Sequence, residues 1–155
     1  MQPMKMTIPS VDACMQQAPL ELTPGTIVDE LCSAACEFVG RTRPEVHEQL
    51  GRLHALEYGA YEPMASRCLE DVAHEACNRW PLRSVWIRHA IGIVQIGQPS
   101  VIIRVGSIHR DDAFKACRYV IDRIKTYVPV WKNQLYEHGR LRPPGMQVQL
   151  QDTKA

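Results

Sequence analysis

Two lysines and a His-Arg pair lie at opposite ends of one predicted helix in the last third of the chain. His109 and Arg110 precede its first turn, Lys125 lies near its end, and Lys132 follows just beyond Pro129. A packed core has no use for these charges, because burying an unpaired charge is costly. A lysine that is partly removed from water and close to a second lysine binds its proton less tightly, and can act as an acid, base or nucleophile near neutral pH. These residues therefore predict a pocket for an anionic, ring-shaped substrate.

The helix itself is predicted over residues 111–128 by a single apolar stripe. Its members recur in steps of three and four: Phe114, Cys117, Ile121, Ile124 and Val128. Acidic residues in the first turn and basic residues near the end complement the helix dipole. Pro129 ends the helix because it has no N–H to donate. We expect Lys125 to lie close to the buried stripe, with its ammonium partly desolvated, and Lys132 to lie on an extended segment.

The remaining elements indicate an α+β fold. The patterns predict strands at 32–39 and 53–61, a helix at 64–77, a hairpin of strands 84–94 and 100–106, a mobile loop at 41–52 and a short helix at 26–31. This order predicts a two-layer sandwich, in which a largely antiparallel sheet has helices packed on one face, in an α/β-hammerhead-like arrangement. We expect residues 1–22 to be a flexible segment, 23–142 to form one domain, and 143–155 to be a flexible tail.

The numbers of basic and acidic residues limit the kinds of molecule that the chain is expected to bind. The 18 basic and 17 acidic residues leave a net charge of +1, which argues against a dedicated nucleic-acid binder. Residues 104–142 contain nine Lys and Arg and four Asp and Glu, which gives this segment a net charge of +5. This excess fits an anionic small molecule or an acidic partner, and a merely solvated basic face is the alternative. No apolar run is long enough to span a membrane.

The cysteines predict neither a metal centre nor a disulfide framework. No two of them form a Cys-x-x-Cys pair, and several fall on apolar helix positions, as small buried residues do. This usage is typical of a reducing compartment, and the N-terminal segment has no apolar signal core. We therefore expect a cytosolic protein without a cofactor. The six are Cys14, Cys32, Cys36, Cys68, Cys77 and Cys117.

Five segments, in register, together resemble the large, catalytic subunit family of molybdopterin synthase. The first is the run from His109 to Lys132, with Val-Pro-Val-Trp-Lys at its end. The others are Glu-Phe-Val-Gly-Arg-Thr-Arg at 37–43, Leu-Glu-Tyr-Gly-Ala-Tyr-Glu-Pro-Met-Ala at 56–65, Arg-Trp-Pro at 79–81 and Gly-Gln-Pro-Ser-Val at 97–101. The resemblance covers residues 31–142 and leans towards eukaryotic-type members.

The resemblance implies a specific reaction. The family converts cyclic pyranopterin monophosphate into molybdopterin by installing two sulfurs as a dithiolene. The sulfur arrives on a small ubiquitin-like subunit, as a thiocarboxylate at its C-terminal glycine. The large subunit forms a homodimer, and each copy binds one small subunit, which makes a heterotetramer. The implied catalytic residues are Lys125 and Lys132, which also bind substrate, and the further substrate-binding residues are Arg41, Thr42, Arg43, His109, Arg110, Asn133 and Gln134.

The chain departs from the family pattern at three places, one of which is Gly-Arg-Leu-Arg at 139–142, where the family has a tryptophan after the glycine. Asn133 and Gln134 follow Lys132 where family members carry a basic residue and a glutamate, and Ala90 replaces an arginine. A non-catalytic binding module with a degenerate site therefore stays open as the alternative to a sulfur-transferring enzyme. An RNA-binding domain is disfavoured, because the chain lacks the aromatic, glycine-spaced strand motif of base-stacking domains.

Helix geometry predicts a composite site. Arg110 and Lys125 are fifteen residues apart, so their backbones lie roughly 22 Å apart on one helix. A pterin would barely bridge that distance. We therefore expect a symmetric homodimer in which one chain supplies His109 and Arg110 and the other supplies Arg43 and the two lysines.

Overall fold

The computed structural model describes residues 8–23 and 31–142. Within this part of the chain two helices and eight strands follow one another in the order ββββαββαββ. Their bounds are β1 Ser10–Gln17, β2 Ala34–Arg41, β3 Val46–His47, β4 Gly51–Ala60, α1 Glu62–Arg79, β5 Leu82–Gln95, β6 Pro99–Ser107, α2 Arg110–Tyr127, β7 Val130–Tyr136 and β8 Gly139–Leu141. The predicted α+β class is confirmed.

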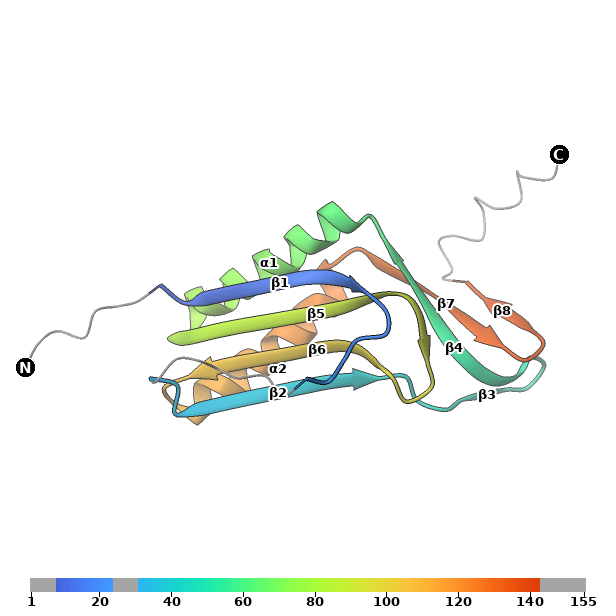
Figure 1. The fold of residues 1–155 in the computed structure, drawn as a ribbon, viewed down its shortest axis with the longest axis horizontal. Coiled ribbons are helices and arrows are strands. Elements are labelled where there is room, and N and C mark those ends of the chain that lie inside the picture. Colours follow the sequence, from blue (N-terminus) through green and yellow to red (C-terminus); the bar gives the residue numbers. More distant parts are fainter. Residues whose placement is uncertain (1–7, 24–30, 143–155) are drawn as a thin grey trace, which may run out of the picture.

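The strands form one eight-stranded sheet with two parts, joined through the long strand β5 (Figure 1). The first half of β5 lies between β6 and β1, and its last residues pair with β4, which continues to β7 and β8. All pairings are antiparallel except that of β1 with β5, which is parallel. Gly92, with a φ of +92°, stands where β5 passes from one part to the other, a conformation that residues with a Cβ rarely adopt.

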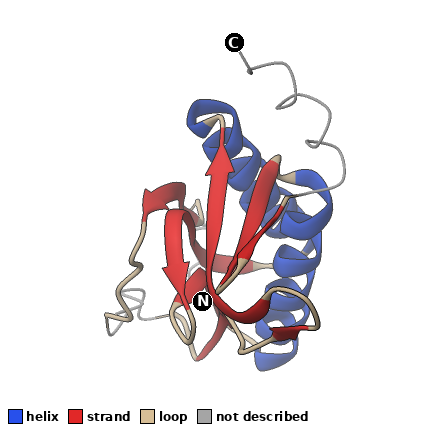
Figure 2. Cartoon of the chain, turned by 90° about the vertical axis from the view of Figure 1, so that its right-hand side faces the viewer, coloured by secondary structure: helices blue, strands red, loops and turns tan. Residues whose placement is uncertain are grey.

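Both helices pack on one face of the sheet, as predicted, and Figure 2 shows the resulting two layers. The main core lies between them, because each helix turns an apolar stripe towards the strands. In α1 the buried residues are Ala65, Leu69, Val72, Ala73 and Ala76. In α2 they are Ala113, Ala116, Cys117, Val120, Ile121 and Ile124.

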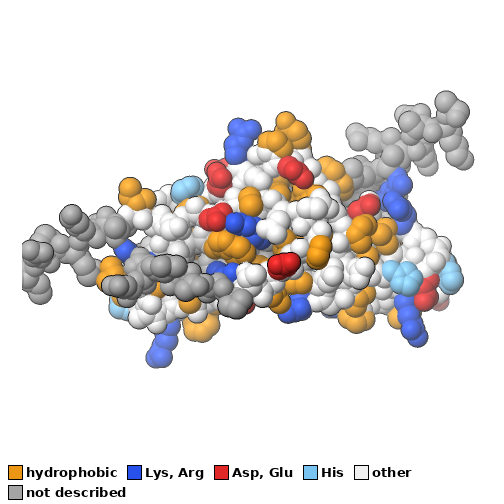
Figure 3. All heavy atoms as spheres, viewed as in Figure 1, with side chains coloured by type: hydrophobic (Ala, Val, Ile, Leu, Met, Phe, Trp, Pro, Cys, Tyr) orange, Lys and Arg blue, Asp and Glu red, His pale blue; other side chains and the backbone are white. Residues whose placement is uncertain are grey.

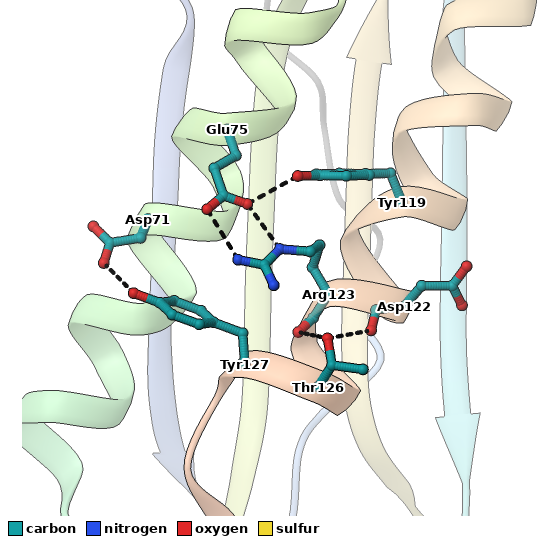
Figure 4. Close-up of polar contacts among 7 residues, drawn as sticks. All are labelled: Asp71, Glu75, Tyr119, Asp122, Arg123, Thr126 and Tyr127. Carbon is teal, nitrogen blue, oxygen red and sulfur yellow. Dashed lines mark hydrogen bonds and ion pairs between the residues drawn. The ribbon is translucent and has the colours of Figure 1, made fainter.

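Polar side chains tie the outer surfaces of the two helices together (Figure 4). Glu75 of α1 accepts hydrogen bonds from the Arg123 guanidinium at 2.9 and 3.1 Å and from the Tyr119 hydroxyl at 2.9 Å. One turn away, the Tyr127 hydroxyl donates to Asp71 at 3.2 Å. The hydrogen bond with Arg123 lowers the pKa of the Glu75 carboxyl, so that the pair stays ionised at neutral pH. The C-terminal half of α2, which carries Lys125, is thus held against α1.

The opposite face of the sheet carries interspersed hydrophobic and charged side chains (Figure 3). There Trp86 lies between two guanidinium groups, at 4.5 Å from Arg88 and 4.7 Å from Arg104. Arg88 pairs with Asp12, and Arg104 pairs with Glu37. The segment that follows β1 crosses this face and buries Leu20 against Ala90, Val94 and Ile102. Neither described helix has the length and apolar character needed to cross a membrane.

The prediction of a flexible N-terminal segment is wrong for residues 10–17, which form β1. Val11, Ala13 and Met15 alternate along this strand and pack against the main core, a period of two that the polar composition of the segment conceals. β1 pairs in parallel with β5, and no local signal in the sequence reports such a distant partner. The predicted short helix at 26–31 falls almost entirely outside the described residues.

Two further predictions need correction. The predicted loop at 41–52 contains the short strand β3 and the first residues of β4. The segment after α2 is extended, as predicted, and its strands β7 and β8 join the sheet. Phe114, predicted to be part of the buried stripe, is 66% exposed, because the buried arc of α2 is centred on the small residues Ala113 and Ala116. The predicted strands, the hairpin and both long helices are confirmed within a few residues.

Candidate functional site

Lys125 and Lys132 line one cavity of about 430 Å³. It lies between the C-terminal half of α2 and the strands beneath, where the two parts of the sheet meet. Its wall consists of Tyr58, His89, Ser100, Val101, Ile121, Ile124, Lys125, Val128, Val130, Trp131 and Lys132. The pocket thus combines apolar side chains with two ammonium groups and three other polar side chains, a composition that suits a small molecule with both apolar and polar parts.

The end of α2 and the pairing of β7 bring the two lysines together. The N–H of Val128 donates to the carbonyl of Ile124 at 3.2 Å, and Pro129 prevents another helical turn. The chain then turns into β7, which pairs with β4 so that Lys132 lies opposite Tyr58. Lys125 and Lys132 are both exposed, so the predicted partial desolvation of Lys125 is wrong for the single chain.

A glycine on β4 sets the place of the indole beside Lys132. Gly59 is the register partner of Trp131, and a Cβ built on Gly59 would lie 2.3 Å from the indole Nε1. Only a residue without a side chain allows the ring to lie this close to the strand. Trp131 therefore forms part of the cavity wall instead of swinging into solvent.

Three polar residues that we did not predict as site residues complete the wall: Tyr58, His89 and Ser100. The Tyr58 and His89 rings meet edge to face with centroids 5.2 Å apart. The Ser100 hydroxyl donates to the carbonyl of Gly40 at 3.2 Å. Burial raises the pKa of Tyr58, and a hydrogen bond with Ser100 opposes this only in part, so the phenol stays protonated at neutral pH. Tyr58 and Ser100 belong to segments that carry the family resemblance, but the sequence gives no signal that they share a cavity with His89.

The Arg41–Arg43 segment lies beside the β5–β6 turn and does not line this cavity. The Arg41 guanidinium donates to the carbonyl of Gly97 at 2.8 Å. Thr42 exchanges backbone hydrogen bonds with Gly97 and Gln98 at 2.8 and 3.2 Å, and its side chain is buried. Its Oγ1 is the one buried side-chain oxygen or nitrogen in the described part of the chain that has no hydrogen-bond partner. Arg43 is exposed.

His109 and Arg110 lie at the start of α2, far from the lysine cavity. His109 is the N-cap residue and Arg110 the first helical residue, and both side chains are exposed. Neither lines the cavity, which is bounded by residues from the last two turns of the same helix. The structure of one chain therefore does not bring the predicted basic residues into one site.

Asn133 and Gln134 belong to β7 but do not line the cavity either. Successive residues of a strand point to opposite faces, so Asn133 points away from the side that Lys132 occupies. Its amide donates to Glu57 of the neighbouring strand at 2.9 Å. Gln134 lies further along β7, between Leu56 of β4 and Leu141 of β8.

Lys125 also borders a second hollow, of about 420 Å³, on the other side of α2. Its lining is mixed: Cys36, Glu37, Phe38, Phe114, Cys117, Arg118, Ile121, Asp122 and Lys125. Burial and the neighbouring Cys36 thiol raise the pKa of Cys117 to about 12. This thiol is therefore protonated, and a poor nucleophile, at neutral pH. Among the described residues no three His, Cys, Asp or Glu side chains gather in a way that could hold a metal ion.

Comparison with known proteins places the chain in a family. The sequence pattern of the MoaE protein family matches residues 15–127. The chain belongs to the MoaE family. It is similar to the molybdopterin synthase catalytic subunit of Arabidopsis thaliana, with 41% identity over 86 residues, which are 56% of this chain and 43% of that protein.

The MoaE fold is confirmed by solved structures. A molybdopterin synthase structure from Staphylococcus aureus superimposes with a TM-score of 0.74 at 32% identity, covering 89% of this chain and 96% of that one. A complex of subunits 1 and 2 of molybdopterin-converting factor from Helicobacter pylori gives a TM-score of 0.61 at 25% identity, covering 74% of each chain. The chain spans about half the length of the plant and mammalian relatives that it matches, from 43% to 59%.

Proposed function

We propose that the chain is the catalytic subunit of a molybdopterin synthase. It transfers sulfur to cyclic pyranopterin monophosphate and so makes the dithiolene of molybdopterin. The observation that carries this proposal is the convergence of Lys125 and Lys132, from two different elements, on one cavity of mixed polar and apolar lining. Membership of the MoaE family supports it.

The two lysines have different surroundings and therefore different proposed roles. Lys125 lies on α2, which α1 braces through Glu75 and Arg123, so its backbone is firmly placed. We assign proton transfer, or transient attachment to the substrate or the acyl tail, to Lys125. Lys132 lies beside the indole of Trp131 and orients the anionic substrate by charge.

The sulfur donor in this proposal is a small ubiquitin-like partner that ends in a glycine thiocarboxylate. The Helicobacter pylori complex, which holds two subunits of a molybdopterin-converting factor, supports a partner of this kind. We place its extended tail in the second hollow, because Lys125 borders both that hollow and the lysine cavity. The ammonium group would then lie between the thiocarboxylate and the pterin.

The site in this proposal is shared between two copies of the chain, in a homodimer that binds two small partners as a heterotetramer. His109 and Arg110 lie at the far end of α2 from Lys125, too far to reach the same ligand within one chain. A second copy would bring them to the lysine cavity, together with Arg43 from the chain that supplies the lysines.

Mixing two inactive variants tests this arrangement. Arg110→Ala and Lys125→Ala chains, unfolded and refolded together, should form mixed dimers that each keep one intact site, so part of the activity returns. Mixed dimers without activity would contradict the shared site.

Turnover tests the function itself. The purified chain, the pterin precursor and a thiocarboxylated small partner should yield a dithiolene product, detected by its oxidised fluorescent derivative. Binding of both partners without product would favour the non-catalytic binding module. Lys125→Ala, with Lys115→Ala of the same helix as its control, shows whether the activity depends on the cavity.

We also propose a cytosolic location. Among the described residues, Cys14, Cys36, Cys68, Cys77 and Cys117 are free thiols, which is typical of proteins in a reducing compartment. Fractionation of the source cells with an antibody to the chain tests this, and a signal in a membrane or organelle fraction would contradict it.

A further inference from the structure

His89 is a buried histidine on the cavity wall whose two ring nitrogens have different surroundings. The ring is 7% exposed, and Nδ1 lies 2.9 Å from the carbonyl oxygen of the next residue, Ala90. A carbonyl oxygen can only accept, so Nδ1 carries the hydrogen. Nε2 then holds a lone pair and is not among the buried unpartnered atoms of the described residues, so without a partner it is exposed at the cavity surface.

The surroundings keep this ring neutral. Burial lowers the pKa of His89, and the bond to Ala90 offsets that effect only in part. The other titratable groups on the cavity wall are the ammonium groups of Lys125 and Lys132 and the phenol of Tyr58, none of which is an anion at neutral pH. If the His89 ring were protonated, its positive charge would be repelled by the two ammonium groups, and no carboxylate on the cavity wall would stabilise it.

The cavity therefore has an uneven set of hydrogen-bonding groups. The two lysines only donate, and the Ser100 hydroxyl uses its hydrogen on Gly40. His89 Nε2 is the wall's neutral nitrogen acceptor. The oxygens of Ser100 and Tyr58 can also accept, so a ligand that pairs with the two ammonium groups and with Nε2 combines anionic or other acceptor atoms with a hydrogen-bond donor.

We propose that His89 Nε2 accepts a hydrogen bond from an N–H of the bound pterin ring and so determines specificity for a ring with donor edges. This assignment rests on the proposed function, because a phosphorylated pterin combines an anionic group with ring N–H donors. The lysines bind the anionic group, and His89 selects the ring through its hydrogen bond to the N–H. A ring of similar size without the N–H would cover Nε2 without giving it a hydrogen bond, which costs affinity.

Three variants test the assignment. His89→Asn keeps an amide where Nδ1 donates to Ala90 but removes the acceptor at Nε2. His89→Gln can place an amide oxygen near the position of Nε2. His74→Asn, at an exposed histidine of α1, is the matched control. The measurement is the Kd of the full chain for cyclic pyranopterin monophosphate by titration calorimetry, with circular dichroism and melting curves to check folding.

We expect His89→Asn to weaken binding by about ten-fold, the scale of one lost hydrogen bond that leaves a buried group unpaired. His89→Gln should stay within about three-fold of the unmodified chain, and His74→Asn should match it. Unchanged binding in His89→Asn would overturn the assignment. Equal losses in the Asn and Gln variants would also overturn it, because the shape of the imidazole would then be what matters.

The binding readout separates this inference from the proposed function. If the unmodified chain binds no pterin at all, the proposed function fails, and the assignment falls with it. If the chain binds the pterin and turns it over, but His89→Asn does so equally well, the function stands and only the role of His89 is refuted.

Discussion

Replacing Gly59 with alanine should damage the site while leaving the fold nearly intact. The new Cβ would lie 2.3 Å from Nε1, 2.5 Å from Cε2 and 2.8 Å from Cζ2 of the Trp131 indole, whereas ordinary contacts begin near 3.4 Å. The ring must therefore move by about 1 Å, which changes the cavity wall beside Lys132. Displacements of about 1 Å at a reacting centre can lower rates by about 100-fold.

Two opposing contributions keep the effect on stability small. Overpacking costs about 1 to 3 kcal/mol in a closed core, but Trp131 is 38% exposed and can swing outwards, so the low end applies. Gly59 does not have a positive φ, so alanine fits its backbone and stabilises the folded state by about 0.4 to 1 kcal/mol through the unfolded chain. We expect the free energy of unfolding to change by less than about 1 kcal/mol.

The assay combines turnover of the pterin precursor with denaturant unfolding, for Gly59→Ala, Trp131→Ala and the double variant. If the clash with the indole causes the loss, the glycine substitution should have little further effect once the ring has gone. Full activity in Gly59→Ala would refute the reasoning about the placement of Trp131. An equal loss in the presence and absence of the indole would show that another contact is responsible.

Three further predictions concern single side chains. Lys125→Ala should lower turnover by at least about 100-fold, which is the usual effect of losing an acid–base group. Lys115→Ala, on an exposed turn of the same helix, should leave turnover unchanged. Near-normal single-turnover rates in Lys125→Ala would remove Lys125 from the mechanism. Glu75 has a pKa below its ordinary 4.5 because it accepts from Arg123, so its contribution to stability is present above that pH and is lost as the pH falls through the lowered value. Glu75→Gln should therefore flatten the acid side of the stability profile between those two pKa values, and an unchanged profile of unfolding midpoint against pH would contradict this. The pKa of the Cys117 thiol is raised to about 12, so iodoacetamide at pH 8 should alkylate this thiol far more slowly in the folded chain than in urea. Mass spectrometry of the peptide that contains Cys117 measures the two rates. Equal rates would contradict the burial of Cys117.

The sequence predicted those parts of the fold whose signals are local. The apolar steps of α1 and α2, the β-branched runs of the hairpin and the stop at Pro129 act within a few residues of one another, and the corresponding elements are confirmed. The prediction failed where the partner is distant. β1 has a polar composition and forms a strand because it pairs with β5 and its apolar side chains pack against α1. Phe114 has the right spacing for the buried stripe, but the position of the sheet decides which arc of the helix is covered.

The candidate site divides in the same way. Residue types and spacing predicted a functional role for Lys125 and Lys132, and the structure places both on one cavity. The same reasoning could not reveal His89, because a lone histidine in a strand has no local signal, and its role depends on contact with Tyr58 and the end of α2. Nor did spacing show that Asn133 faces Glu57 instead of the cavity.

The sequence by itself therefore determined which reactive side chains are present and how they are spaced along the predicted helix. These are two lysines on either side of Pro129 and a His-Arg pair one helix length away, within a family pattern from residue 31 to 142. What only the tertiary structure decided is which of these groups share a space. Helix and turn signals act over a few residues, so they can be read along the chain. The cavity depends on β7 pairing with a strand more than seventy residues earlier, and such a pairing is chosen by how the whole sheet buries its apolar face.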